Sequence, residues 1–238
     1  MVNYKEKFAE AMTIAVNEGF ESTRAEWLFL DVFGWSKTDY LIHKDEQMSL
    51  TSINKLDKAL DRMVTGEPIQ YIVGFQSFYG YQYKVNQHCL IPRPETEEVM
   101  LHFLELCKKT DTIADIGTGS GAIALALAKN RPDWSVTAAD ISQEALQLAS
   151  ENAKNQNLNI FFKKSDCFAE ISEKYDIIVS NPPYISREDE SEVGLNVLHS
   201  EPHLALFADE DGLAIYRRIA EDAKYHLKDG GKIYLEIG

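Results

Sequence analysis

The sequence has little cysteine, no long hydrophobic run and a shortage of basic side chains. Its three cysteines, Cys89, Cys107 and Cys167, form no Cys-x-x-Cys pair and have no histidine at metal-ligand spacing. This pattern excludes a disulfide scaffold and predicts reduced thiols and no metal site. No stretch approaches the ~18 apolar residues of a membrane helix, and the amino terminus has no apolar signal core. We therefore expect a cytoplasmic protein with no membrane partner.

The charge balance disfavours nucleic acid as a partner. The formal net charge is −14, from 24 Lys and Arg against 38 Asp and Glu. Residues 1–74 hold 8 basic and 12 acidic side chains, and residues 75–238 hold 16 and 26, so the two balances are −4 and −10. A protein that tracks the phosphate backbone needs a basic surface. We therefore expect no direct nucleic-acid substrate.

Ordinary composition and a change in hydrophobic period predict two domains. A hydrophobic share of 45% and a charged share of 26% exclude a disordered or collagen-like chain. Residues 1–74 have a helical period, with Gly34 and Gly66 where helices would end, and predict a helical substrate-docking domain. One expected apolar face comprises Trp27, Leu28, Leu30 and Val32. Residues 75–92 begin with alternating aromatic residues and predict a β-hairpin linker. We expect a monomer.

Residues 93–238 alternate between strand and helix patterns. The predicted strands are Thr112–Ile116, Ser135–Ala139, Ile160–Lys163, Asp176–Ser180 and Lys232–Ile237, and the predicted helices are Ala122–Lys129, Gln143–Asn155 and Gly212–Leu227. This alternation predicts an α/β fold with a doubly wound, mainly parallel sheet. Ligands of such sheets bind beyond the carboxyl ends of the strands, so the loops that follow the strands are the candidate site.

A glycine-rich loop follows the first predicted strand and opens directly into a helix. Its candidate cofactor-binding residues are Asp115, Gly117, Thr118, Gly119, Ser120 and Gly121. Glycines at this spacing let a ligand approach the backbone, and Asp140, at the end of the second strand, can hold both ribose hydroxyls of a nucleoside. The loop also fits the dinucleotide pattern, which leaves a nicotinamide cofactor open. The Asp115 carboxylate would repel a pyrophosphate and favours a cationic ligand such as S-adenosylmethionine.

Two further loops complete the candidate site. Asp166 and Cys167 follow the third strand, and Cys167 and Phe168 can flank an adenine ring, although a capping Asp and core side chains would give the same pattern. The fourth strand ends in Asn181-Pro182-Pro183-Tyr184.

The two prolines stiffen this last loop and leave its carbonyls without local donors. The Asn181 side-chain oxygen and the Pro182 carbonyl can accept hydrogen bonds from one planar NH₂ group, while Tyr184 offers a flat face. Asn181, Pro182 and Tyr184 are therefore the candidate catalytic residues. Asn181 to Tyr184 are the candidate substrate-binding residues, and Asn181 also faces the cofactor.

These loops together resemble an S-adenosylmethionine-dependent methyltransferase that modifies planar nitrogens. The Asn-Pro-Pro-Tyr loop is shared by adenine-N6 and protein glutamine-N5 methyltransferases. The segments 65–74, 90–97, 201–207 and 211–213 resemble the PrmC/HemK family of release factor glutamine methyltransferases. The resemblance implies methyl transfer from S-adenosylmethionine, with S-adenosylhomocysteine as product, to N5 of the glutamine in the Gly-Gly-Gln motif of class-1 peptide chain release factors. The alternatives are an adenine-N6 methyltransferase acting on DNA or RNA and a non-catalytic binding module.

The chain departs from the family pattern in two places. Cys167 stands where relatives often carry a larger apolar or aromatic residue beside the adenine. The family fold continues with one more helix and an antiparallel strand pair, so we expect those C-terminal strands to be missing here.

Three other groups of polar residues have a weaker claim to the site. Arg93 and Glu95 can line the cofactor entrance or brace the domain junction. His199 and His203 are expected in a loop, because Pro202 interrupts any helix between them. Asp209–Asp211 is expected as a solvated helix start.

Overall fold

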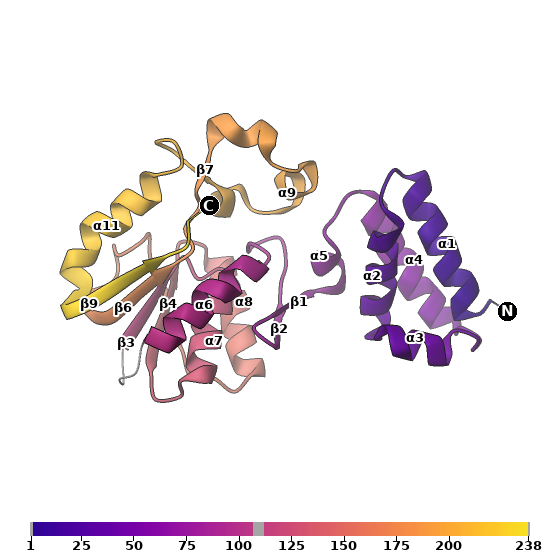
Figure 1. Ribbon diagram of the computed structural model, residues 1–238, viewed down its shortest axis with the longest axis horizontal. Helices are drawn as coiled ribbons and strands as arrows, with labels where there is room; N and C mark the ends of the chain where they lie inside the picture. Colours follow the sequence, from indigo (N-terminus) through magenta and orange to yellow (C-terminus); the bar gives the residue numbers. More distant parts are fainter. Residues whose placement is uncertain (1, 107–111, 238) are drawn as a thin grey trace. The chain divides into compact units, whose positions relative to one another are not determined.

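The computed structural model describes residues 2–106 and 112–237, and the chain divides into two compact units, Met1–Gly74 and Phe75–Gly238 (Figure 1). None of the described helices is both long and apolar enough to cross a membrane. Cys89 and Cys167 are buried thiols, and Cys107 lies outside the described residues.

The first unit is a helical bundle around an aromatic core. Its helices are α1 (Tyr4–Asn17), α2 (Ser22–Phe33), α3 (Lys37–His43), α4 (Leu50–Val64) and α5 (Ile69–Val73). Asn3 and Ser36 start α1 and α3 with reciprocal capping boxes, and Gly34 ends α2 in the left-handed conformation. Leu28 and Phe29 are fully buried, whereas Trp27 is 59% exposed. The expected face with Trp27 is wrong, because residues one and two positions apart diverge by 100° and 200° around a helix.

The predicted hairpin forms and lies in the second unit. Its antiparallel strands are β1 (Phe75–Phe78) and β2 (Tyr81–Lys84). Phe78 and Tyr83 are almost fully buried in the core cluster of the second unit. Asn152 exchanges two hydrogen bonds with the Lys84 backbone and donates a third to the Ser120 carbonyl. The hairpin is therefore attached both to the core and to the glycine-rich loop.

The second unit contains a five-stranded parallel sheet with the order β5-β4-β3-β6-β9. The strands are β3 (Thr112–Ile116), β4 (Ser135–Asp140), β5 (Phe161–Lys164), β6 (Tyr175–Ser180) and β9 (Leu227–Leu235). The predicted fold class is confirmed. The predicted strand starts five residues after the observed start of β9, because Gly230 and Gly231 interrupt the β pattern of the sequence. The sheet accommodates this interruption through a register shift between β6 and β9.

Helices cover both faces of this sheet (Figure 1). A cluster on one face joins α6 (Pro94–Leu106), α7 (Ala122–Asn130) and α8 (Gln143–Asn155) to Ile177 and Val179 of β6. The cluster on the other face joins α11 (Ala214–His226) to Ile178. Burial on both faces explains the continuous apolar run of β6. Helix α6 is absent from our prediction, which treated Pro94 as part of a stiff segment although proline suits the first turn of a helix.

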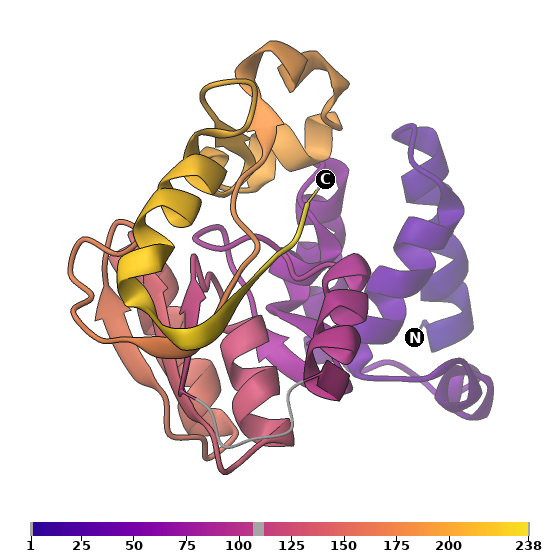
Figure 2. The same cartoon turned by 60° about the vertical axis from the view of Figure 1, so that its left-hand side comes forward.

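A small parallel sheet lies beyond the carboxyl end of β6 (Figure 2). It pairs β7 (Ile185–Ser186) with β8 (Phe207–Ala208), and the chain between them forms the 3-10 helix η1 (Arg187–Glu192), α9 (Leu195–Ser200) and α10 (His203–Leu206). His199 and His203 lie on α9 and α10 rather than in a loop. Pro202 caps α10 and separates the two helices. Asp209–Asp211 is an exposed turn before α11.

Asp115 of β3 connects the sheet to α7 through its buried carboxylate. Its side chain is fully buried, and Oδ2 accepts hydrogen bonds from the Thr118 hydroxyl at 2.6 Å and the Ala124 amide at 3.1 Å. Oδ1 is buried with no hydrogen-bond partner among the described residues. Burial raises the pKa of Asp115 to about 7, against the smaller lowering effect of the two donors.

We predict that Gly212→Ala destabilises the second unit more than Gly80→Ala. Both glycines have a positive φ, +80° and +77°, but a Cβ at Gly212 would lie 2.1 Å from the Tyr184 carbonyl oxygen, whereas a Cβ at Gly80 meets nothing within 4 Å. The Gly80 variant should lose about 1–2 kcal/mol of unfolding free energy from backbone strain alone. The Gly212 variant should lose more, measured by urea denaturation, and equal losses would contradict the predicted clash.

We predict that Asp115→Asn gains stability relative to the wild type as the pH rises. The folded pKa of about 7 lies above the ordinary aspartate value of 3.8, so the folded state retains a proton that the unfolded state releases between these two pH values. Wild-type stability therefore falls across this window, whereas asparagine does not titrate. The difference between the two proteins should change by about 3–4 kcal/mol in unfolding experiments from pH 4 to pH 7.5. A difference independent of pH would contradict the raised pKa.

Candidate active site

The candidate site lies where the strand order reverses, between β3 and β6. These neighbours run parallel with Asp115 paired to Val179, so their carboxyl ends meet at the same edge of the sheet. The buried Ser180 hydroxyl donates a 2.5 Å hydrogen bond to the Ile116 carbonyl, one residue before the glycine-rich loop. The glycine-rich loop and the Asn-Pro-Pro-Tyr loop therefore emerge side by side, at the position where open α/β sheets bind ligands.

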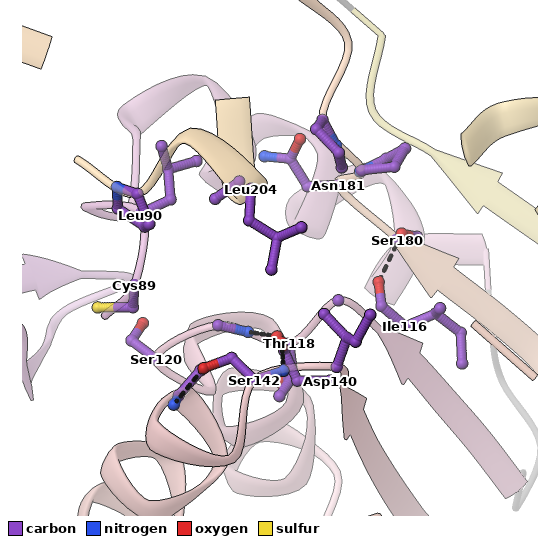
Figure 3. Close-up of a pocket in the computed structure, with 18 of the residues that line it drawn as sticks. Cys89, Leu90, Ile116, Thr118, Ser120, Asp140, Ser142, Ser180, Asn181 and Leu204 are labelled. Atoms are coloured by element: carbon purple, nitrogen blue, oxygen red, sulfur yellow. Dashed lines mark hydrogen bonds between the residues drawn. The ribbon is translucent and has the colours of Figure 1, made fainter. Parts of the chain in front are cut away.

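A cavity of about 370 Å³ lies over this edge, within the range of small-molecule sites. It brings together most of the predicted site residues: Gly117, Thr118, Gly119, Ser120, Asp140, Asp166, Cys167, Asn181, Pro182 and Pro183. Asp115, Gly121 and Tyr184 do not line it. Figure 3 shows Asn181 and Leu204 on one side of the cavity and Thr118, Ser120 and Asp140 on the opposite side, with Cys89 and Leu90 between them.

The glycine-rich loop is held by the strand beside it. The Gly117 and Thr118 amides both donate to the Ala139 carbonyl at 2.9 Å, which turns the chain back over β4. Gly121 caps α7 with a φ of +83°, and a Cβ there would lie 2.7 Å from Leu125 Cδ1 and 3.0 Å from Ala149 Cβ. Gly121 therefore allows close packing of α7 on α8.

Asp140 presents a fixed carboxylate at the end of β4. Its Oδ2 accepts from the Gly119 amide at 2.8 Å and its Oδ1 from the Ser142 amide at 2.9 Å. Burial raises the pKa of Asp140, while these backbone donors lower it. A carboxylate has about four acceptor positions, so each oxygen keeps capacity for a further donor in the cavity. The next residue, Ile141, lines the cavity with 44% of its surface exposed, an apolar contact that our sequence reasoning missed.

The loop after β5 supplies a charged pair and a buried thiol. Asp166 and Arg218 of α11 form a 2.9 Å ion pair, and both line the cavity. Cys167 is buried with a φ of +50°, and burial raises the pKa of its thiol. Phe168 does not line the cavity, because its ring stacks on His226 at a centroid distance of 4.7 Å. Of the two residues expected to flank an adenine, Cys167 alone faces the cavity.

The Asn-Pro-Pro-Tyr loop divides between two hollows. Asn181, Pro182 and Pro183 line the main cavity, and the Asn181 amide nitrogen donates to the Thr96 hydroxyl at 3.3 Å. Tyr184 is 42% exposed and lines a shallower hollow with Tyr216 and Leu213. The loop therefore presents polar acceptors inward and an aromatic ring outward.

A buried ion pair closes another side of the cavity. The Glu201 side chain is 1% exposed and accepts from Arg93 Nη2 at 2.5 Å and from the Ile91 amide at 3.0 Å. Arg93 and Pro202 line the cavity, so this pair joins two of its walls. Arg93 thus has the lining position that was one of its two expected roles, whereas Glu95 is exposed and does not line the cavity.

Several lining residues come from segments that motif reasoning did not include. They are Gln87, His88, Cys89, Leu90, Thr96, Ser142, Leu204, Ala205, Ile215 and Ile219. The only available signal was that some lie in or beside the segments 90–97 and 201–207, which carried the family resemblance. Across residues 2–106 and 112–237, no three His, Cys, Asp or Glu side chains gather as a metal site requires.

The burial of Asp115 changes one argument made from the sequence. A carboxyl group with a pKa of about 7 is partly protonated at neutral pH, so it repels a pyrophosphate less than an exposed carboxylate would. The geometry of the cavity therefore does not distinguish S-adenosylmethionine from a nicotinamide dinucleotide.

Comparison with known proteins supplies further observations. The family model described as Methyltransferase small domain matches residues 96–204, and that described as PrmC N-terminal domain matches residues 8–74. The crystal structure of a methyltransferase from Pyrococcus furiosus is similar over 76% of this chain and 79% of that chain, with a TM-score of 0.51 and 19% identity, which shows the fold.

Two curated relatives are far more similar in sequence. The release factor glutamine methyltransferase of Streptococcus pneumoniae is 62% identical over 225 residues, covering 94% of this chain and 81% of that protein. The release factor glutamine methyltransferase of Staphylococcus aureus is 50% identical over 241 residues, covering 100% of this chain and 87% of that protein. With its methyltransferase fold and its paired loops at the β3–β6 edge, this chain belongs to the family of release factor glutamine methyltransferases.

Proposed function

We propose that this protein transfers a methyl group from S-adenosylmethionine to the side-chain N5 of the glutamine in the Gly-Gly-Gln motif of class-1 peptide chain release factors, in the cytoplasm. One observation carries the proposal. Asp140, suited to a nucleoside, and Asn181, suited to a planar NH₂ group, line opposite sides of one cavity, which Pro182 also lines. The similarity to release factor glutamine methyltransferases supports the choice of substrate. The first unit is proposed to dock the release factor.

The residues of the cavity fit S-adenosylmethionine, which supplies an activated methyl group on a sulfonium sulfur. Asp140 would accept from the ribose hydroxyls, since both of its oxygens have spare acceptor capacity. Ile141 and Cys167 would pack against the adenine, and Asp166 would accept from its amino group beside the Arg218 pair. The positive-φ glycines, Gly117 and Gly119, leave room for the ligand along the loop.

Asn181 and Pro182 would orient the substrate nitrogen. An amide nitrogen is a weak nucleophile because its lone pair is delocalised into the carbonyl group. Hydrogen bonds from its two N–H groups to the Asn181 Oδ1 and the Pro182 carbonyl would stabilise the positive charge that develops on nitrogen. The same two contacts fix the approach direction, and such positioning is worth on the order of 7–11 kcal/mol in favourable cases.

The residues around this pair would exclude water and guide the substrate. Pro183 has no N–H to compete for the acceptors, and Leu204 covers the cavity beside Asn181. Tyr184, exposed on the outer side of the loop, would offer its ring to the substrate chain. After methyl transfer the nitrogen is strongly acidic, so it can lose its proton to water without a dedicated base.

The direct test offers labelled S-adenosylmethionine to the protein together with a class-1 release factor, its Gly-Gly-Gln→Gly-Gly-Ala variant, and DNA. We expect label on the wild-type release factor only. Label on DNA but not on the release factor would overturn the proposal and favour the adenine-N6 alternative. Label on both forms of the release factor would place the methyl group on another residue.

We predict that Asn181→Ala lowers kcat by about 10²–10³-fold, the cost of removing one well-placed transition-state contact. Affinity for S-adenosylmethionine, measured by calorimetry, should stay within about threefold, because Asp140 and the glycine-rich loop are unchanged. A loss of cofactor affinity in proportion to the loss of activity would show that Asn181 does not act on the substrate.

We predict the opposite division of effects for Asp140. Asp140→Ala should weaken cofactor binding by about 10- to 100-fold, because hydrogen bonds to charged groups contribute about 1.5–3 kcal/mol. At saturating cofactor, kcat should recover most of the wild-type value. Asp140→Asn, which keeps one acceptor oxygen, should lie between the alanine variant and the wild type, and unchanged affinity in both variants would contradict a ribose-binding role.

A further inference from the structure

The Asn181 side chain can help the reaction in one of its two amide orientations only. Its oxygen accepts hydrogen bonds, whereas its NH₂ group donates them. If the NH₂ end faced the substrate amide, two donors would oppose each other and the contact would be lost. The hydrogen-bond partners of the Asn181 NH₂ group therefore determine whether the Asn181 oxygen is free to bind the substrate amide.

The NH₂ end of Asn181 is held by α6. Asn181 Nδ2 donates to Thr96 Oγ1 at 3.3 Å, and only 5% of the Thr96 surface is exposed. A hydroxyl group can accept from the NH₂ end of an amide or donate to its oxygen, so Thr96 by itself would tolerate either orientation of the Asn181 amide. A third group is needed to fix the direction.

Glu236 is that third group. It directly follows β9, and its amide donates to the Ser180 carbonyl at 3.1 Å while the Tyr216 hydroxyl donates to its carbonyl at 2.6 Å. These bonds fix the Glu236 backbone beside the residue that precedes Asn181. Burial raises the pKa of the Glu236 carboxyl group, and the neighbouring Thr96 and Asn181 side chains lower it by a smaller amount.

The Glu236 carboxylate determines which of these side chains donates and which accepts. An ionised carboxylate can only accept, and Glu236 Oε2 is buried without a hydrogen-bond partner in the part of the chain that the structure describes. When Glu236 is ionised, it draws the Thr96 proton toward itself and leaves the Thr96 lone pairs to accept from the Asn181 NH₂ group. The Asn181 Oδ1 is then the end available to the cavity.

We propose that Thr96 and Glu236 are positioning residues that fix the amide orientation of Asn181 and thereby select substrates that present an NH₂ group. The proposal rests on the proposed function, since it assigns Asn181 to the substrate amide. Neither residue needs to touch the reacting atoms. Both act through the orientation of Asn181, so their loss should affect methyl transfer and spare cofactor binding.

The first experiment compares Thr96→Val with Thr96→Ser under saturating substrate and cofactor. Valine has the shape of threonine but neither accepts nor donates, so kcat should fall about 10- to 100-fold, as for a misplaced transition-state contact. Serine keeps the hydroxyl and should restore kcat to within about threefold of the wild type. Cofactor affinity should be unchanged in both variants, and the melting temperature should fall in the valine variant only, because valine removes a hydroxyl group from a buried position. Equal activity of the valine variant and the wild type, or an equal loss in both variants, would overturn the proposal.

The second experiment tests the direction of the hydrogen bonds. In Glu236→Gln the new NH₂ group can donate to Thr96, so Thr96 can donate to the Asn181 oxygen and the amide can reverse. We expect kcat to fall about 5- to 50-fold, less than for loss of Asn181 itself. Glu95→Gln is the matched control, because Glu95 acts on Glu236 only through its charge. The control should stay within about twofold of the wild type, and equal effects of the two glutamine variants would overturn the proposal.

A readout that needs no substrate separates this proposal from the proposed function. In ¹⁵N-labelled protein, the Asn181 side-chain NH₂ signals, identified by their absence from Asn181→Ala, should exchange slowly with water in the wild type and in Thr96→Ser. They should exchange faster in Thr96→Val. Absence of release factor methylation with this pattern intact would refute the function and keep the orientation role. Methylation of the release factor with identical NH₂ exchange in all three proteins would support the function and refute the orientation role.

Discussion

The parallel pairing of β3 with β6 is the constraint on which the site depends. It places the end of Ile116 beside Ser180, and the buried hydrogen bond between them holds the two strand ends together. Because the chain reverses its order across the sheet here, the loops after the two strands diverge and leave a space between them. The cavity is a consequence of this topology, and its chemistry comes from the residues that the two loops carry.

Buried polar groups then attach the walls of the cavity to the sheet. Asp115 joins β3 to the start of α7, Asn152 joins the hairpin to the glycine-rich loop, and Glu201 joins the end of α9 to the segment before α6. Each is at most 4% exposed, so loss of one partner would leave a buried polar group unsatisfied. Rigidity of the walls matters for the proposed methyl transfer, because that step depends on how the substrate nitrogen is positioned.

Most of the residues that motifs in the two central loops predicted line the cavity, because local spacing determines the backbone of such loops. Glycines that must adopt a positive φ and prolines that remove donors are recognisable in a single sequence. Phe168 shows the limit of this reasoning. Its place after a strand end suggested an adenine contact, yet its ring stacks on His226, which is 58 positions away along the chain. Tyr184 likewise faces outward although it is adjacent to residues that line the cavity.

The sequence by itself determined the helical first unit, the alternation that produces the parallel sheet, and the two loops that meet at its edge. These features follow from local period and local backbone preferences. Only the tertiary structure decided that Thr96 and Arg93 line the cavity, that Glu236 lies beside Ser180, and that Asp115 is buried. The physical reason is that a hydrogen bond between residues 85 positions apart, as between Thr96 and Asn181, depends on how α6 and β6 pack, and no local pattern records that packing.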